Sequence, residues 1–132
     1  MNNKYTHKKG IVYLNQYHIV FCPKYRRKVL VGDIEKDLRQ IFYDIAKEKD
    51  VEIKALEIMP DHVHMFISFD PRQPLHSLVR YFKGTSSKIL RDKYPELRSR
   101  IPSLWTRSYF CRTVGYVSEE AIQKYIENQK NV

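Results

Sequence analysis

The sequence predicts an α+β fold, with an antiparallel sheet built in the order β-α-β-β-α-β and one more helix after it. Runs rich in β-branched and aromatic residues alternate with two long segments whose apolar residues recur every three or four positions. Turn-forming residues separate these segments, and no internal repeat or low-complexity tract interrupts them. A chain of 132 residues fits one domain, so residues 1–132 are expected to form a single unit.

The first part of the chain is expected to contain a long strand followed by a helix. Residues 11–22 are rich in β-branched and aromatic side chains, which predicts a strand that kinks at Asn15 and Gln16. Asp33 is expected to be the N-cap of the helix, because its side chain can accept hydrogen bonds from free backbone N–H groups. The apolar residues of this helix recur at a spacing that buries one face: Ile34, Leu38, Ile41, Phe42 and Ile45.

The same patterns predict the rest of the chain. A turn at Pro60 and Asp61 joins two strands into a hairpin, and Pro74 suits the first turn of a second helix. Right-handed crossovers then place the first and third strands in the middle of a split β-α-β-β-α-β sheet of ferredoxin-like or RRM-like type. The further expected elements are strands over 51–59, 62–69 and 108–114, a second helix that bends at 84–87, and a last helix over 121–129 with Ser118 as its N-cap.

The chain is unusually basic for its length. It has 24 Lys and Arg against 15 Asp and Glu, a formal charge of +9, which favours nucleic acid over an anionic membrane or an acidic protein as partner. Ten tyrosines and six phenylalanines offer flat faces on which unpaired bases can stack. No segment approaches the roughly 18 apolar residues of a membrane span, and the N-terminus lacks the apolar core of a signal peptide. A cytoplasmic location is therefore expected, with Cys22 and Cys111 as free, largely buried thiols.

Two histidines at the start of the strand over 62–69 are the first candidate functional residues. Side chains two apart on a strand lie on the same face, so His62 and His64 are expected side by side. Val63 and Met65 then point the other way. Paired neutral imidazoles can hold a divalent metal. The pattern alone leaves open the alternative of two ordinary polar residues on a solvated face.

The last predicted helix carries a second candidate pair. Tyr125 and Gln129 are four residues apart, so they share one face of the helix. The amide oxygen of Gln129 is an acceptable third metal ligand, which would place Tyr125 one turn away from that metal. Taken in isolation, the helix is also compatible with a packed Tyr125 and a solvent-exposed Gln129.

Five segments of the chain, in order, are FCPKYRRKVL, EIMPDHVHMFIS, VRYFKGTSSKIL, LWTRSYFCRTVG and IQKYIENQ. Together they resemble the single-tyrosine HUH transposases (TnpA) of small bacterial and archaeal insertion sequences. The resemblance covers nearly everything from Tyr13 to Gln129 in the right order and spacing, with no departure at a motif position.

This resemblance implies a role for each candidate. It makes His62 and His64 the metal-binding pair of the HUH motif. Gln129 matches the third ligand, Tyr125 matches the nucleophile, and Gly115 falls in a flexible tether that acts as a hinge. It also implies Mg²⁺ or Mn²⁺, a homodimer and single-stranded DNA with a subterminal hairpin as substrate, without a nucleotide cofactor and without a membrane.

The implied reaction is a DNA strand transfer. The oxygen of Tyr125 attacks a metal-bound scissile phosphate, forms a 5′-phosphotyrosine link and frees a 3′-hydroxyl. Because the bond energy is kept, a 3′-hydroxyl can later rejoin strands without ATP. The alternatives are a non-catalytic module that binds single-stranded nucleic acid or hairpins, and a metal-dependent nuclease that hydrolyses with water. A covalent adduct through Tyr125 distinguishes them.

Two basic patches are the candidate DNA contacts, since basic groups interleaved with an aromatic side chain suit a nucleic-acid backbone. His18 on the first strand could flank the metal or simply fill a face of the strand, and the second interpretation is preferred. Glu57 and Asp61 are expected to orient the histidines as hydrogen-bond acceptors. Trp105 is expected to pack in the core or at a dimer contact.

The two candidate DNA-contact patches are defined by their residues. The first patch is Lys24, Tyr25, Arg26, Arg27 and Lys28, and the second is Arg80, Lys83, Ser86, Ser87 and Lys88.

Overall fold

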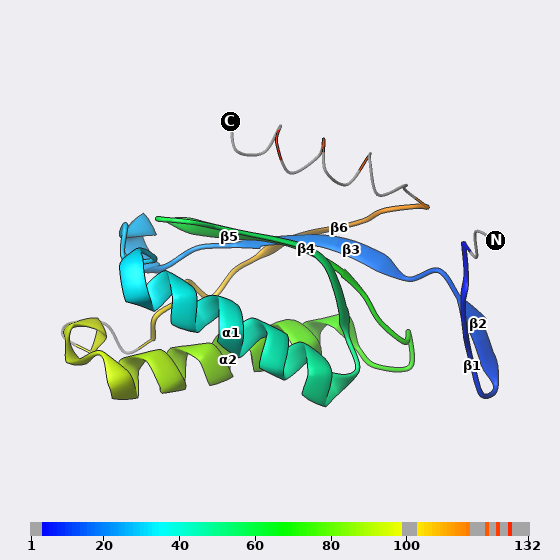
Figure 1. Cartoon of the computed structure of the whole chain (residues 1–132), viewed down its shortest axis with the longest axis horizontal. Helices are drawn as coiled ribbons and strands as arrows, with labels where there is room; N and C mark the ends of the chain where they lie inside the picture. Colours follow the sequence, from blue (N-terminus) through cyan, green and yellow to red (C-terminus); the bar gives the residue numbers. More distant parts are fainter. Residues whose placement is uncertain (1–3, 99–102, 117–120, 122–123, 125–126, 128–132) are drawn as a thin grey trace.

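The structure is a computed structural model that describes residues 4–98, 103–116, 121, 124 and 127. A four-stranded antiparallel sheet has two long helices, α1 and α2, packed on one face (Figure 1). We call the opposite face of the sheet the distal face. The elements are β1 (Thr6–Lys8), β2 (Ile11–Tyr13), β3 (Gln16–Phe21), the 3-10 turn η1 (Lys24–Arg26), α1 (Gly32–Lys49), β4 (Glu52–Met59), β5 (His62–Ser68), α2 (Leu75–Lys93), the 3-10 turn η2 (Pro95–Leu97) and β6 (Phe110–Thr113).

The strand order confirms the predicted split arrangement. The order across the sheet is β4-β5-β3-β6, so the first and third strands of the predicted pattern, β3 and β5, occupy its centre. The strand that begins at His62 is paired along both of its edges, with β3 on one side and β4 on the other. A strand held in this way is a rigid support for functional side chains.

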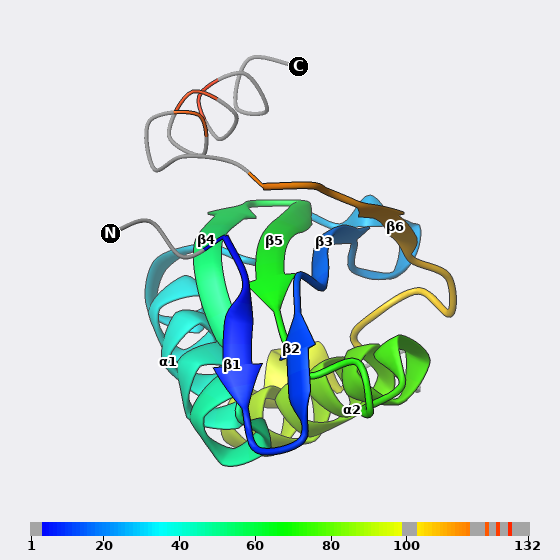
Figure 2. The same cartoon turned by 90° about the vertical axis from the view of Figure 1, so that its right-hand side faces the viewer.

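The predicted long strand over 11–22 is wrong in detail, because the chain divides into two strands at the position where a kink was predicted. Asn15 separates them: its side-chain amide donates to the carbonyl of Phe69 at 2.9 Å, and its carbonyl accepts from the Phe69 N–H at 3.2 Å. β2 therefore leaves the main sheet and pairs with β1 in a small hairpin, whose turn uses Gly10 at φ +81° (Figure 2). β1 was not predicted, because three polar residues give no periodic signal.

Two predicted helix starts are also shifted. α1 begins at Gly32 with Val31 in the N-cap position, and no side chain caps it. Asp33 lies instead within the first turn, where its negative charge is favourable beside the helix dipole. Pro74 occupies the N-cap position of α2 rather than its first turn. The fourth strand is shorter than predicted, Phe110–Thr113 rather than 108–114.

At residues 84–87, where a bend was predicted, α2 continues without a break, because the chain is helical throughout Leu75–Lys93. Residues 121, 124 and 127 are helical, as predicted for the last helix, whereas its N-cap candidate Ser118 lies outside the described residues. No helix in the described part of the chain is long and apolar enough to cross a membrane.

The core lies between the sheet and the two helices. Its largest fully buried side chains include Phe42 of α1, Phe82 of α2 and Trp105. The predicted core position of Trp105 is confirmed: it is 2% exposed, and its indole N–H donates to the hydroxyl of Ser86 at 3.0 Å. Both cysteines are free, but Cys111 is exposed rather than buried, because it lies on the edge strand β6.

Candidate metal and DNA site

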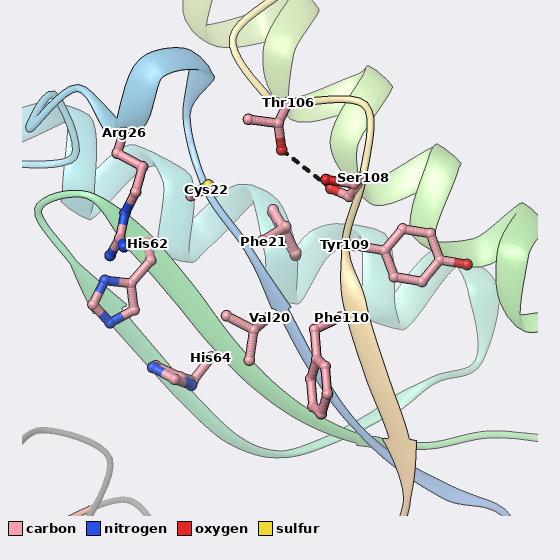
Figure 3. A pocket seen from close by; sticks show the side chains of 10 residues that line it. All are labelled: Val20, Phe21, Cys22, Arg26, His62, His64, Thr106, Ser108, Tyr109 and Phe110. Carbon is pink, nitrogen blue, oxygen red and sulfur yellow. Dashed lines mark hydrogen bonds between the residues drawn. The ribbon is translucent and has the colours of Figure 1, made fainter. Parts of the chain in front are cut away.

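His62 and His64 lie side by side on the distal face, at the start of β5. The residues between and after them, Val63 and Met65, are buried on the opposite face, against the helices. This alternation confirms the predicted orientation. The two imidazole rings are 4.8 Å apart between centroids and nearly perpendicular, at 85°. Figure 3 shows both rings pointing into one cavity.

Asp61 orients His62, as predicted. A carboxylate oxygen of Asp61 lies 2.6 Å from Nδ1 of His62, and the other oxygen accepts from the guanidinium of Arg26 at 3.3 Å. The hydrogen bond to His62 is the main cause that lowers the pKa of Asp61 below its ordinary value. Asp61 is therefore ionised at neutral pH and accepts the Nδ1 proton of His62, which leaves Nε2 of that ring free to bind a metal. The other predicted acceptor, Glu57, pairs with His64 across β4 and β5.

His18 has a closer relation to the site than predicted. It does not simply fill a face, because Nε2 of His18 lies 3.2 Å from Nδ1 of His64, which favours the alternative that His18 flanks the candidate site. The alternation of β3 places His18 on the distal face, since its neighbours Tyr17 and Ile19 face the core. This pattern was visible in the sequence. The register in which β3 pairs with β5 could not be predicted from the sequence.

Burial keeps two of these imidazoles neutral. It lowers the pKa of His18 from 6.5 to about 4, and the positive charges of His64 and Arg112 act in the same direction. Burial also lowers the pKa of His64 to about 4, with a smaller contribution from the charge of His62. A neutral imidazole is the form that binds a metal, so His64 is ready to act as a ligand at neutral pH.

The donor set fits a divalent metal. Within the described residues, no group of three or more His, Cys, Asp and Glu side chains could by itself hold an ion. As a metal site, His62 and His64 would therefore supply two nitrogen donors and would need a further ligand. The predicted third ligand, Gln129, and the predicted nucleophile, Tyr125, lie outside the described residues. Two imidazoles with an amide oxygen suit Mn²⁺ more naturally than Mg²⁺.

A cavity of about 680 Å³ extends from the histidines toward β6. Arg26 stands beside His62 at one end, and Phe110 projects from β6 (Figure 3). Phe110 is 54% exposed, so its ring is accessible for stacking on a base. Sequence reasoning did not select Phe110, because an aromatic residue in a predicted strand is more often part of the core.

Residues 11–129 match the family described as transposase IS200 like. The chain belongs to this family. It is 40% identical over 123 residues to the ISDra2 transposase TnpA of Deinococcus radiodurans, a match that covers 92% of this chain and 88% of the relative. It is 34% identical over 116 residues to the transposase of insertion sequence element IS200 of Salmonella typhimurium, which covers 86% of this chain and 76% of the relative.

Solved structures agree with this membership. A putative transposase from Deinococcus radiodurans superposes with a TM-score of 0.77 at 35% identity, over 94% of this chain and 97% of the other. A REP-associated tyrosine transposase bound to a REP hairpin has a TM-score of 0.63 at 16% identity, over 89% of this chain and 68% of the other, which shows the fold alone. The resemblance seen in the five sequence segments is therefore confirmed, and this member of the family is a transposase.

The first predicted DNA patch is presented to solvent. Tyr25 and Arg26 both adopt the left-handed backbone conformation, at φ +60° and +50°, in the η1 turn. This turn leaves the ring of Tyr25 86% exposed. Such strain in residues other than glycine is found where function requires a particular side-chain direction. The turn ends next to the histidines, where Arg26 contacts Asp61.

The second predicted patch is partly wrong. Ser86 is fully buried, and its hydroxyl bonds to Trp105 and to backbone carbonyls of its own helix. Ser87 is also buried, and its hydroxyl accepts from the N–H of Leu104. Lys83 is 9% exposed, and its ammonium donates to three carbonyls of the loop before β6. The bonds of Lys83 and Ser87 connect the loop to α2, and all three side chains are buried rather than presented on an exposed patch.

The remaining members of the second patch are exposed. Lys88 forms an exposed ion pair with Asp92 at 3.4 Å. Arg80 is exposed and lines a second cavity of about 440 Å³ together with Lys24 of the first patch. Arg107 lines the same cavity. The structure thus brings basic residues from both predicted patches to one place.

Gly115 lies two residues after the end of β6, in the segment predicted as the tether to the last helix. Its carbonyl accepts a hydrogen bond of 2.9 Å from the side-chain amide of Gln16, which is 5% exposed. The same amide lies 3.5 Å from the carbonyl of Val114. Gln16 therefore fixes one end of this segment to the central strand β3. The hinge function of Gly115 stays a prediction.

The neutral state of His18 makes stability dependent on pH. Its pKa is about 4 in the folded chain and about 6.5 when unfolded, so below pH 6.5 the unfolded chain binds the proton more readily. In a metal-free sample, we expect the free energy of unfolding in urea to fall by roughly 2–3 kcal/mol between pH 7 and pH 4 through this residue. His18→Asn cannot titrate and should flatten this slope. An unchanged slope in His18→Asn would contradict the assignment.

Proposed function

We propose that this transposase cuts and rejoins single-stranded DNA at insertion-sequence ends through a 5′-phosphotyrosine intermediate. The observation that carries the proposal is the pair formed by His62 and His64 on the distal face. Each ring has its Nδ1 in hydrogen-bond contact, with Asp61 and His18 respectively, so both can offer Nε2 to one ion.

The tyrosine is the group that reacts. The oxygen of Tyr125 forms a bond to phosphorus, the bond from phosphorus to the 3′ oxygen breaks, and the tyrosine proton is lost while the leaving oxygen gains one. A divalent ion, Mn²⁺ or Mg²⁺, held by His62, His64 and Gln129 would supply positive charge at the phosphate and the leaving oxygen. Rejoining is the reverse: a 3′-hydroxyl attacks the phosphotyrosine and restores the free phenol.

The DNA is proposed to lie across the basic surface beside the histidines. Arg26 approaches the cavity of His62 and His64, and Phe110 offers a stacking face within it. The neighbouring basic cavity of Lys24 and Arg80 extends this surface. A solved relative with a similar fold is bound to a REP hairpin, which supports an end hairpin as the substrate here.

A homodimer is proposed as the working form. Within the part of the chain that the structure describes, β6 is the last strand on its side of the sheet, and all four of its residues are exposed, so this side of the sheet offers a surface to a second copy. Two copies of the chain would bring two tyrosines to the two ends of an element. Size-exclusion chromatography with light scattering should therefore give about twice the mass of the 15.9 kDa chain.

Formation of a covalent adduct tests the reaction. Oligonucleotides that span the DNA flanking the gene, labelled at the 5′ or the 3′ end, are incubated with the full chain and Mn²⁺. The proposal expects a protein–DNA adduct on a denaturing gel that carries only the label 3′ to the cut, and a released fragment with a 3′-hydroxyl. Cleavage without any adduct would contradict it.

Arg80→Ala tests the proposed DNA surface. Because one phosphate contact is lost, we expect affinity for the hairpin oligonucleotide to fall several-fold and the slope of log affinity against log salt to decrease by about 1. Fluorescence anisotropy at several salt concentrations measures both. Lys47→Ala is the matched control, since Lys47 is an exposed cation on α1 that does not line this cavity. Equal losses in both variants would point to net charge alone.

A further inference from the structure

We propose that His18 is a positioning residue that accepts a hydrogen bond from Nδ1 of His64 and so directs Nε2 of His64 toward the metal. This inference rests on the proposed metal site and assigns a role to a residue outside the ligand set. The role depends on which ring nitrogen carries the shared proton, and it does not require a change in the charge of either ring.

The contact between the two imidazoles is directional. Nε2 of His18 and Nδ1 of His64 are 3.2 Å apart. The ring planes are within 10° of each other, and the ring centroids are 5.4 Å apart. Since the two nitrogens are much closer than the centroids, the rings meet edge to edge with these atoms facing each other. This is the arrangement of a nitrogen-to-nitrogen hydrogen bond.

A hydrogen bond between two neutral imidazoles needs one proton between the facing nitrogens. Either His64 donates from Nδ1 or His18 donates from Nε2. A neutral ring carries a single N–H, so donation from Nδ1 leaves Nε2 of His64 with a free lone pair. Donation from His18 would instead place the His64 proton on Nε2 and block that nitrogen as a ligand. Only the first arrangement is compatible with metal binding through Nε2.

Each of the two proposed metal-binding histidines then has a hydrogen-bond acceptor at its Nδ1, and the two acceptors are chemically different. Asp61 accepts from Nδ1 of His62 at 2.6 Å, and His18 takes the corresponding place at His64. Metal-binding histidines usually donate their second N–H to such an acceptor, and its removal typically costs about 10–100-fold in metal affinity. The acceptor at His64 is an imidazole rather than a carboxylate, which adds no negative charge to this buried position.

His18 is held firmly enough to serve this purpose. It is 4% exposed and lies on β3, which is paired with β5 and with β6. The ring of Phe110 packs against it edge-on, with centroids 6.1 Å apart and planes at 69°. A side chain fixed on a central strand restricts the rotation of the His64 ring that it contacts.

The tautomer can be observed directly in the metal-free full chain. Long-range ¹H–¹⁵N correlation spectra of a sample labelled at histidine, recorded at pH 7.5, distinguish a protonated Nδ1 from a protonated Nε2. We expect His64 to carry its proton on Nδ1. A His64 ring protonated on Nε2 would overturn the inference.

Metal affinity gives a second, independent measurement. Free Mn²⁺ is titrated by electron paramagnetic resonance with wild type, His18→Leu and His18→Gln, without DNA. His18→Leu removes the acceptor and should weaken Mn²⁺ binding by about 10-fold or more, whereas His18→Gln keeps an acceptor oxygen and should recover most of the affinity. Ser68→Ala is the control, because Ser68 is a buried residue of β5 whose loss should leave affinity unchanged.

The outcomes separate this inference from the proposed function. Equal Mn²⁺ affinity in wild type and His18→Leu would overturn the role of His18 alone. Absence of Mn²⁺ binding in the wild type would overturn the metal site and this inference with it. If His18→Leu loses Mn²⁺ affinity because it folds poorly, its melting temperature should fall as well. In that case His18→Gln, if it folds normally and binds Mn²⁺ with restored affinity, would still support the inference.

Discussion

Tyr125→Phe is expected to abolish the covalent protein–DNA adduct completely and to leave hairpin affinity within about twofold of wild type. The substitution removes one oxygen, which is the atom that forms the bond to phosphorus in the proposed reaction. In the proposed complex, binding depends on basic and aromatic side chains elsewhere, so hairpin affinity should survive. Denaturing gels with end-labelled oligonucleotides measure the adduct, and fluorescence anisotropy measures the affinity.

The matched control for this variant is Tyr43→Phe. Tyr43 is an exposed tyrosine of α1, on the face of the sheet away from the histidines, and its hydroxyl should have no effect on the adduct. Cleavage that persists in Tyr125→Phe would instead indicate a nuclease that uses water. Hairpin binding by the wild type without any cleavage would indicate a non-catalytic binding module.

Removal of a metal ligand is expected to have the second largest effect. His62→Ala deletes one of the two nitrogen donors, so Mn²⁺-dependent cleavage should fall by about 100-fold or more, because a bound ion contributes several kcal/mol to charge stabilisation at the phosphate. Chelation of the metal with EDTA should have the same effect on the wild type. Initial rates of adduct formation over a range of Mn²⁺ concentrations provide the measurement.

His7→Ala is the control for that experiment, because His7 is exposed on the small β1–β2 hairpin, apart from the main sheet. It should retain the wild-type rate and the wild-type response to Mn²⁺. A wild-type rate in His62→Ala, or full activity in EDTA, would show that the histidine pair does not hold a required ion.

The sequence predicted the central sheet because its signals are local. Alternation over 62–69 and the turn at Pro60 lie within a few residues, and right-handed crossovers then order the strands. The β1–β2 hairpin was missed because it depends on contacts across more than fifty residues: Asn15 is held by the backbone of Phe69. The kink predicted at Asn15 and Gln16 falls at this break, but no local pattern shows that the chain before it pairs with β1 instead of joining the main sheet.

The candidate site also contains features that local sequence patterns predict and a contact that they do not predict. His62 and His64 were found because a spacing of two on a strand is a local property. The contact between His18 and His64 was missed because it depends on the register of two strands that are 46 residues apart. For α2, a usable signal was present: Lys83 and Ser86 recur with Val79, Phe82 and Leu90 at helical spacing, and this spacing marks them as part of the buried face.

The ammonium of Lys83 has a consequence for how this protein is dissected by mutagenesis. It satisfies the carbonyl oxygens of residues 106, 107 and 108, which lead directly into the strand that carries Phe110. In an alanine scan of the lysines and arginines with a DNA-binding assay, Lys83→Ala would reduce binding indirectly. The loop before β6 would lose its hydrogen bonds to α2, and Phe110 would be displaced with it. Reagents that acetylate accessible lysines should modify the exposed Lys88 readily and the buried Lys83 slowly, which distinguishes a cation at the surface from one that stabilises the loop.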